Sequence, residues 1–135
     1  MPGYKAVSYR EDDLLLVDYY CTTPNSPKSS GTTTIWLKEA PVWTMQYGGE
    51  YEQIAIPFLK QVLWDAYAAG CFFGGSGPQV RFRSNLLYVN RYDGPFFQDF
   101  RGREEIFRIH NNVKARVLGY HEYLGMALVQ DPSTI

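Results

Sequence analysis

The order of apolar and polar residues in the first part of the chain predicts short β-strands. Residues 4–9 alternate between apolar and polar side chains, and residues 13–20 form a short apolar run. We therefore expect two strands joined by a turn at Glu11-Asp12. The stretch 22–31 is rich in Pro, Ser, Thr and Gly and predicts an exposed loop.

A hairpin of two further strands is predicted over residues 32–38 and 42–47. In its second strand Trp43, Met45 and Tyr47 share one face, because successive side chains of a strand point to opposite sides. Three large side chains on one face are typical of a core, and a ligand site is the alternative. We expect Trp43 to be structural and Tyr47 to lie near the rim of a pocket. A turn is predicted at Gly48-Gly49.

One helix is predicted over about residues 57–69. Pro57 suits the first helical position, and Gly70 suits the end. The apolar residues that recur at helical spacing are Phe58, Leu59, Val62, Leu63, Ala66 and Tyr67. Trp64 lies at the edge of this face, so we expect it to be partly exposed. The glycine-rich stretch 70–78 lacks the Lys-Ser/Thr of a phosphate-binding P-loop and is interpreted as a flexible connection.

The second half of the chain predicts more strands, separated by short turns at "RYDGP", "RGR" and "HNN". These strands are expected at residues 79–83, 85–90, 96–100, 104–109, 113–118 and 120–129. Many strands, one helix and short turns predict an α+β fold. We expect a single domain over residues 1–135, with a curved, mostly antiparallel sheet and the helix packed across it.

Composition limits the cellular compartments and the classes of protein that are expected for this chain. No leader sequence or membrane-length apolar run is apparent. Cys21 and Cys71 are fifty residues apart and fit neither a redox pair nor a zinc site. We therefore expect a cytoplasmic protein without a metal or another cofactor. The chain has 3 Trp, 11 Tyr and 8 Phe, and such side chains suit sheets, interfaces and ligand sites alike.

Positive charge is concentrated in residues 79–116, which hold eight basic and four acidic side chains although the whole chain has a net charge of −1. Seven of the eight basic residues are arginines, which favours recognition of planar or phosphate-like anions. The alternative interpretation is that these arginines lie on exposed strand faces, where they contact water and bind no ligand. Binding to duplex nucleic acid is not expected, because such proteins are usually basic overall.

Signs of catalysis are sparse. His110 lies in a predicted turn, where we expect it to be solvated. His121 is adjacent to Glu122, and neighbours on a strand point to opposite faces, so these two cannot readily act together. No nucleophile elbow and no helical pair of histidines is present. We predict no catalytic residues, although a small enzyme that uses Asp18, Glu104 and His121 is an alternative.

Several segments resemble a bacterial family called domain of unknown function 5680. They are "DYY" (18–20), "PVWTMQYGG" (41–49), "FLKQVL" (58–63), Gly-Pro (77–78), "FRGREEI" (100–106) and "YHEYLG" (120–125). The family pattern has a Pro-Val-Trp-x-Met-x-Tyr strand and an aromatic-x-Gly-x-Glu-x-Ile stretch. The matching residues are Trp43, Met45, Tyr47, Phe100, Gly102, Glu104 and Ile106. Members occur alone or behind an XRE-type helix-turn-helix, which implies an effector-sensing or association module by analogy.

Together these features favour a non-enzymatic protein that binds a small anionic, nucleotide-like ligand for sensing or sequestration. A viral or prophage sponge for a signalling nucleotide would be one form of it. The predicted ligand-binding residues are Trp43, Tyr47, Arg81, Arg83, Tyr88, Arg101 and Arg103, with rings that stack and arginines that pair. The alternative to ligand binding, besides the enzyme, is a homo-oligomeric assembly module with Trp43 or Trp64 at its interface.

Overall fold

Eight antiparallel strands form one open sheet in the computed structural model, which describes residues 1–69, 77–93 and 98–131. The strands are β1 (Tyr4–Glu11), β2 (Leu14–Thr22), β3 (Lys28–Leu37), β4 (Ala40–Tyr51), β5 (Val80–Arg83), β6 (Leu86–Asp93), β7 (Asp99–His110) and β8 (Val113–Ala127). Their order in the sheet is β1-β2-β3-β4-β8-β7-β6-β5. The predicted α+β fold with an antiparallel sheet is confirmed.

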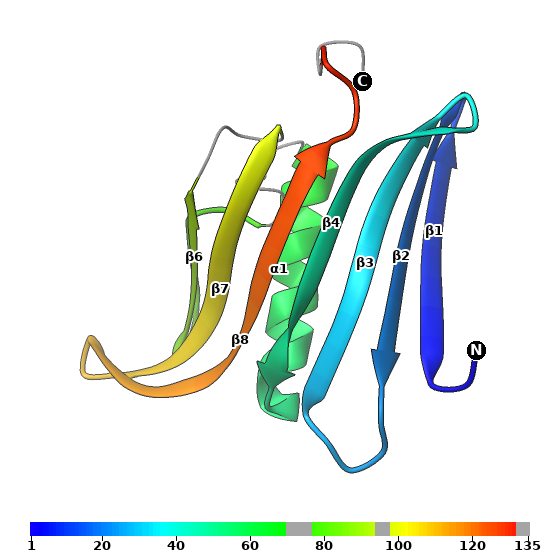
Figure 1. Cartoon of the computed structure of the whole chain (residues 1–135). Coiled ribbons are helices and arrows are strands. Elements are labelled where there is room, and N and C mark those ends of the chain that lie inside the picture. The colour runs from blue at the N-terminus through cyan, green and yellow to red at the C-terminus, as the bar shows by residue number, and fades with distance from the viewer. Residues whose placement is uncertain (70–76, 94–97, 132–135) are drawn as a thin grey trace.

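The helix lies against one face of the sheet (Figure 1). It comprises a short 3-10 turn, η1 (Gln53–Ala55), and α1 (Ile56–Ala69), so the predicted helix is confirmed. Phe58, Leu59 and Val62 pack against four strands, β4, β6, β7 and β8. The sheet residues in this contact are Tyr51, Tyr88, Ile106 and Leu118. We call this side of the sheet the helix-side face, and the other side the open face.

A second apolar cluster surrounds Trp43, which is 3% exposed. The Trp43 ring stacks on Phe100 of β7, with 5.6 Å between ring centroids. Trp43, Met45 and Tyr47 share a strand face, as predicted, because the register of β4 with β8 is unbroken from Trp43 to Tyr51. The prediction that Trp43 is structural therefore agrees with its burial.

Several predicted turns are wrong, because strands continue through them. The loop predicted at 22–31 is shorter, since β2 extends to Thr22 and β3 begins at Lys28. Gly48-Gly49 lies inside β4, "RGR" lies inside β7, and β8 runs through Gly119. Of the glycine-rich stretch predicted at 70–78, only Gly77 and Pro78 fall within the described residues, and Cys71 lies outside them.

The glycines inside the strands are explained by close neighbours. A Cβ atom on Gly49 would overlap the carbonyl oxygen of Tyr120 and lie 2.9 Å from the Cα of His121. A Cβ atom on Gly102 would overlap the hydroxyl of Tyr123 and lie 2.6 Å from the carbonyl oxygen of Arg91. A glycine that admits a neighbouring group looks the same in sequence as a glycine that permits a turn.

Candidate functional site

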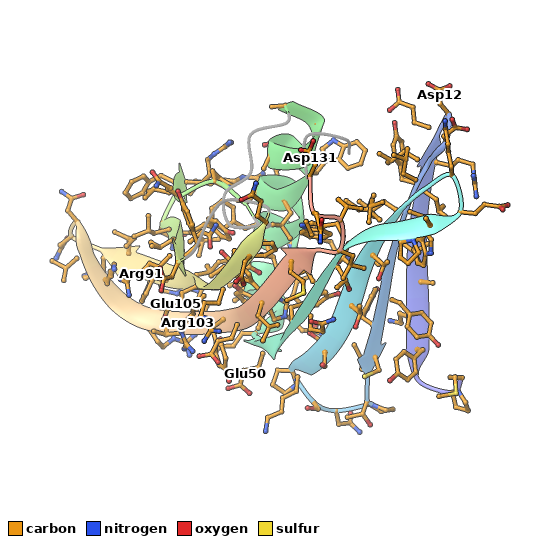
Figure 2. The ribbon with its side chains drawn as sticks, turned by 45° about the horizontal axis from the view of Figure 1, so that its top comes forward. Asp12, Glu50, Arg91, Arg103, Glu105 and Asp131 are labelled. Carbon is orange, nitrogen blue, oxygen red and sulfur yellow. The ribbon has the colours of Figure 1, made fainter. Side chains whose placement is uncertain are left out.

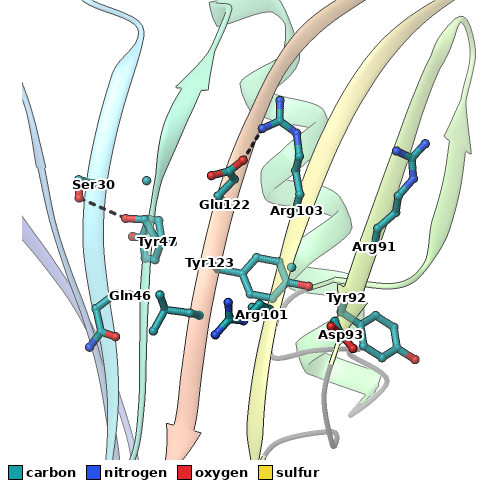
Figure 3. Close-up of a pocket in the computed structure, with 13 residues that line it drawn as sticks. Ser30, Gln46, Tyr47, Arg91, Tyr92, Asp93, Arg101, Arg103, Glu122 and Tyr123 are labelled. Atoms are coloured by element: carbon teal, nitrogen blue, oxygen red, sulfur yellow. Dashed lines mark hydrogen bonds and ion pairs between the residues drawn. The ribbon is translucent and has the colours of Figure 1, made fainter.

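The open face carries a groove of about 700 Å³ across β3, β4, β8, β7 and β6 (Figure 3). Its polar lining residues include Ser30, Gln46, Arg91, Arg101, Arg103 and Glu122. The groove is built by the strand register, which pairs Arg103 with both Arg91 and Glu122, and Arg101 with Leu124. Paired residues of neighbouring strands point to the same face, so the three arginines gather on one side of the sheet.

Two of these arginines are held by acidic neighbours (Figure 2). In Arg103, Nη1 lies 2.7 Å from Oε1 of Glu122 and Nε lies 3.6 Å from Oε2 of Glu105. The Arg103 guanidinium also lies 4.0 Å from the centroid of the Tyr120 ring. Arg91 contacts the same Glu105, with 3.7 Å between Nη1 and Oε1. Arg103 is therefore fixed in orientation on the open face.

Arg101 differs from the other two arginines of the groove. It is exposed, and it forms no ion pair with any of the residues that the structure describes. A guanidinium offers five N–H donors in a planar fork that matches a carboxylate or phosphate. Arg101 can therefore bind an anion without first giving up an internal partner.

The structure brings three of the seven predicted ligand-binding residues to this groove, namely Tyr47, Arg101 and Arg103. Trp43 and Tyr88 are buried in the core of the helix-side face. Arg81 and Arg83 belong to the edge strand β5, where Arg81 contacts Asp65 of α1 at 3.4 Å. These four residues do not line the groove.

Tyr47 lines the groove, but its hydroxyl group belongs to the other face. The Tyr47 hydroxyl donates a hydrogen bond of 2.8 Å to Oδ1 of Asp18, which also accepts one from Thr33. Burial raises the pKa of the Asp18 carboxyl above its ordinary value, although these two hydrogen bonds and nearby His121 offset part of the shift. Tyr47 therefore does not extend its phenol group towards the arginines.

A row of polar residues crosses the helix-side face. The register pairs Glu104 of β7 with His121 of β8, His121 with Gly49 of β4, and Gly49 with Ser29 of β3. In His121, Nδ1 lies 3.1 Å from Oε1 of Glu104, and Nε2 lies 3.1 Å from Oγ of Ser29. The imidazole thus connects a carboxylate to a serine hydroxyl across four strands.

The carboxylate in this row is the most enclosed member. Glu104 is 2% exposed, and its Oε2 accepts a hydrogen bond of 2.7 Å from the Tyr88 hydroxyl. The Tyr88 oxygen accepts in turn from the backbone N–H of Gly77 at 3.2 Å. A buried carboxylate needs such partners, because an unpaired charge in the interior is costly.

Aromatic rings surround the imidazole of His121. The Tyr51 ring meets it edge-on, with 4.9 Å between centroids and an interplanar angle of 89°, and the Tyr47 ring lies at 5.3 Å. Tyr51 is 3% exposed, and its hydroxyl has no hydrogen-bond partner among the described residues. Burial raises the pKa of this hydroxyl well above its ordinary value, so Tyr51 stays a neutral donor.

Sequence reasoning identified part of this row. Glu104 and His121 were candidates for the alternative enzyme, and the structure joins them directly, with Asp18 linked to the neighbouring Tyr47. As expected, the side chains of His121 and Glu122 point to opposite faces, and the acidic partner of His121 is Glu104 on the neighbouring strand. Ser29 was missed because it fell in the predicted loop, 92 residues from His121.

Other predictions concern surfaces and ions. Trp64 is 70% exposed, as expected for the edge of the helix face, whereas Trp43 is buried. Of the two tryptophans considered for an interface, only Trp64 is at the surface. Within residues 1–69, 77–93 and 98–131, no group of three or more His, Cys, Asp or Glu residues is placed to hold a metal ion. No helix in this part of the chain is long and apolar enough to span a membrane.

Comparison with known proteins identifies a family. The model described as Domain of unknown function (DUF5680) matches residues 19–125. No curated protein and no solved structure matches the chain. The residues that carry the family pattern, from Trp43 to Tyr47 and from Phe100 to Ile106 at alternate positions, lie on the helix-side face. The match covers most of the sheet and the whole helix, and the chain therefore belongs to the DUF5680 family.

Proposed function

We propose that this protein binds a small anionic, nucleotide-like ligand in the open-face groove and releases it unchanged. The observation that carries the proposal is the gathering of Arg91, Arg101 and Arg103 around a groove of about 700 Å³. That volume lies within the range of about 300–1,000 Å³ that is typical of small-ligand sites.

The chemistry of the groove suits a phosphorylated ligand. Arg101 has no internal ion pair in the described part of the chain and supplies a free guanidinium, while stacking on Tyr120 keeps Arg103 oriented. Arginine binds phosphate oxygens in pairs, which gives direction as well as charge. Gln46 and Ser30 add neutral hydrogen-bonding groups on the opposite side of the groove, where they can contact a base or a sugar.

Binding without conversion serves either sensing or sequestration. A sensor would pass the bound state to a partner protein, whereas a sequestering protein only lowers the free concentration of the ligand. A viral or prophage sponge for a signalling nucleotide would be a protein of the second kind. Glu122 and Glu105 form ion pairs with Arg103 in the free protein. They would repel a weakly charged anion, so only a highly charged anion would replace them at Arg103.

The test is a thermal-shift and calorimetry series with mono-, di- and cyclic nucleotides. A ligand at 100 times its dissociation constant should stabilise the protein by about 2.7 kcal/mol. Arg101→Ala should weaken binding by about 10- to 100-fold, because hydrogen bonds to charged groups contribute about 1.5–3 kcal/mol. Arg83→Ala is the matched control, since it removes an exposed arginine from β5 outside the groove, and its affinity should equal that of the wild type.

Two results would contradict the proposal. One is the absence of any shift with all nucleotides at about millimolar concentration, which is the weak limit of useful affinity. The other is equal loss of affinity in Arg83→Ala and Arg101→Ala, which would indicate a general charge effect and no defined groove site. Mass spectrometry of the ligand recovered from denatured complex separates binding from conversion.

A further inference from the structure

We propose that Ser29 is a nucleophile activated by His121, and that the helix-side face hydrolyses small carboxylic esters at this serine. The site lies on the opposite face of the sheet from the arginine groove. The inference therefore does not depend on the ligand-binding function and can fail or succeed separately from it.

Ser29, His121 and Glu104 lie in the order that an activated serine requires. A nucleophilic serine needs a base within hydrogen-bond reach, and the base needs a third group to orient it. The Ser29 hydroxyl lies 3.1 Å from Nε2 of His121, and the other ring nitrogen lies 3.1 Å from Glu104. Each nitrogen thus has one partner, and the carboxylate selects the tautomer whose Nε2 is free to accept the serine proton.

Neighbouring side chains hold the imidazole base of His121 in place. Tyr51 and Tyr47 pack against the imidazole, and the Tyr88 hydroxyl holds the second oxygen of Glu104. Glu104 is a positioning residue in this scheme, because it acts on the reaction only through His121. A base that is already oriented avoids part of the entropic cost of reaching the reactive geometry.

A glycine lies between the serine and the histidine, so no side chain separates them. Ser29 belongs to β3 and His121 to β8, so β4 runs between them, and the residue in register with both is Gly49. A Cβ atom at Gly49 would overlap the Tyr120 carbonyl oxygen. Any other residue here would displace β8, and with it His121.

Exposure to solvent increases along the row from the carboxylate to the serine, as catalysis at the serine requires. The side chain of Glu104 is 3% exposed and that of His121 is 13% exposed, while Ser29 is half-buried at the β3 end of the row. A substrate can therefore approach the serine while the carboxylate stays out of water.

The reaction balances without a further reactant except water. His121 takes the Ser29 proton while Oγ bonds to the carbonyl carbon, and the same proton then leaves with the alcohol as the ester C–O bond breaks. Water next gives a proton to His121 and attacks the acyl-serine. The carboxylic acid departs, and the proton held by His121 returns to Ser29.

The test uses the intact protein with a fluorophosphonate probe and with p-nitrophenyl acetate. We expect one adduct, on the peptide that contains Ser29, and none in Ser29→Ala. Ser8→Ala is the control, because Ser8 is an exposed serine of edge strand β1 that belongs to neither candidate site, and it should label like the wild type. Loss of a general base typically slows such reactions by about 100- to 10,000-fold, which is the expectation for His121→Gln.

Glu104→Gln distinguishes a catalytic geometry from a merely structural one. It keeps the shape of the side chain and removes its charge, so kcat for the ester should fall by about 10-fold or more with KM little changed, and Glu104→Asp should recover part of it. Circular dichroism confirms that each variant is folded. The proposal is overturned if the folded wild type gives no adduct, or if the adduct persists in Ser29→Ala. Nucleotide affinity that is unchanged in Ser29→Ala would show that the two faces act separately.

Discussion

At the scale of single residues, glycines decide where aromatic side chains can lie. The Tyr47 hydroxyl passes over Gly31 of β3 to reach Asp18 of β2, and a Cβ atom on Gly31 would lie 2.7 Å from that hydroxyl oxygen. Tyr123 passes over Gly102 of β7 in the same way to reach Asn90 of β6. Each glycine lets a ring cross one strand and bond to the next, which ties three strands together.

Adding a methyl group at such a glycine should be costly. Gly102→Ala places a Cβ atom against the Tyr123 hydroxyl and 2.6 Å from a backbone oxygen, and overpacking of this kind typically costs about 1–3 kcal/mol or more. Gly48→Ala is the control, because its nearest neighbour, Oγ of Ser30, is 3.5 Å away. We expect little change there, or a gain of up to about 1 kcal/mol from the lower flexibility of alanine. Urea denaturation of both variants measures the difference, and equal stabilities would refute this account of Gly102.

The carboxyl group of Asp18 gives stability a pH dependence of defined sign. Its pKa is raised by burial above the ordinary 3.8, so the folded state holds the proton more tightly than the unfolded state does. The protonated group therefore contributes to the free energy of unfolding. This contribution is fully present below the pKa of the unfolded state and is lost as the pH rises through the pKa of the folded state.

Asp18→Asn should therefore be at least as stable as the wild type at neutral pH. The amide oxygen can still accept the Tyr47 hydrogen bond, and no charge has to be buried. The advantage should shrink as the pH falls from about 7 to about 3, where the wild-type carboxyl is neutral in both states. Urea midpoints across this range test the sign. If the wild type instead became more stable relative to Asp18→Asn as the pH rises, the charge on Asp18 would be shown to stabilise the fold.

At the scale of elements, the sequence predicted which segments are strands better than where the strands end. The alternation in residues 42–47 placed Trp43, Met45 and Tyr47 on one face, and α1 began within one residue of Pro57. Strand ends were misplaced wherever glycines occurred, as in β4, β7 and β8. Local sequence does not reveal which strand lies beside a glycine. In this sheet, groups on the neighbouring strands leave no room for a side chain at these positions.

The candidate site shows the same division. The excess of arginine in residues 79–116 indicated an anion-binding surface, but only the register shows that Arg101 and Arg103 share the open face while Arg81 turns towards α1. Ser29 and His121 are connected across β4, and no local pattern signals a contact over such a separation. The sequence shows which residue types are present, but the fold is needed to show which face of the sheet each side chain occupies and which residue it contacts.

Edge strand β1 should be the least protected long element of the sheet. All eight of its residues are exposed, and it pairs on one side only, with β2. Central strand β4 is paired on both sides and carries much of the Trp43 cluster. Amide hydrogen exchange should therefore be faster in β1 than in β4, because local opening there exposes little apolar surface. Equal protection in β1 and β4 would indicate that a second molecule covers this edge in solution.

At the scale of the whole molecule, the sheet consists of two halves that are each local in sequence. Strands β1 to β4 follow one another in order, and so do β5 to β8, so every pairing inside a half joins consecutive strands. The pairing of β4 with β8 joins the halves. Both candidate sites straddle this boundary. Ser29 and Gln46 come from the first half, and Glu104, His121 and Arg101 come from the second.

The boundary between the halves also determines when the two proposed sites are assembled during folding. Strand pairings within each half need only short loops to close, whereas the β4–β8 pairing must bring together residues as distant as Trp43 and Ala127. Long-range pairings of this kind form slowly, because more chain entropy is lost before contacts compensate. A refolding chain should therefore regain most of its strand structure before the two proposed sites are assembled, so reaction of Ser29 with the fluorophosphonate probe should recover after the circular dichroism signal.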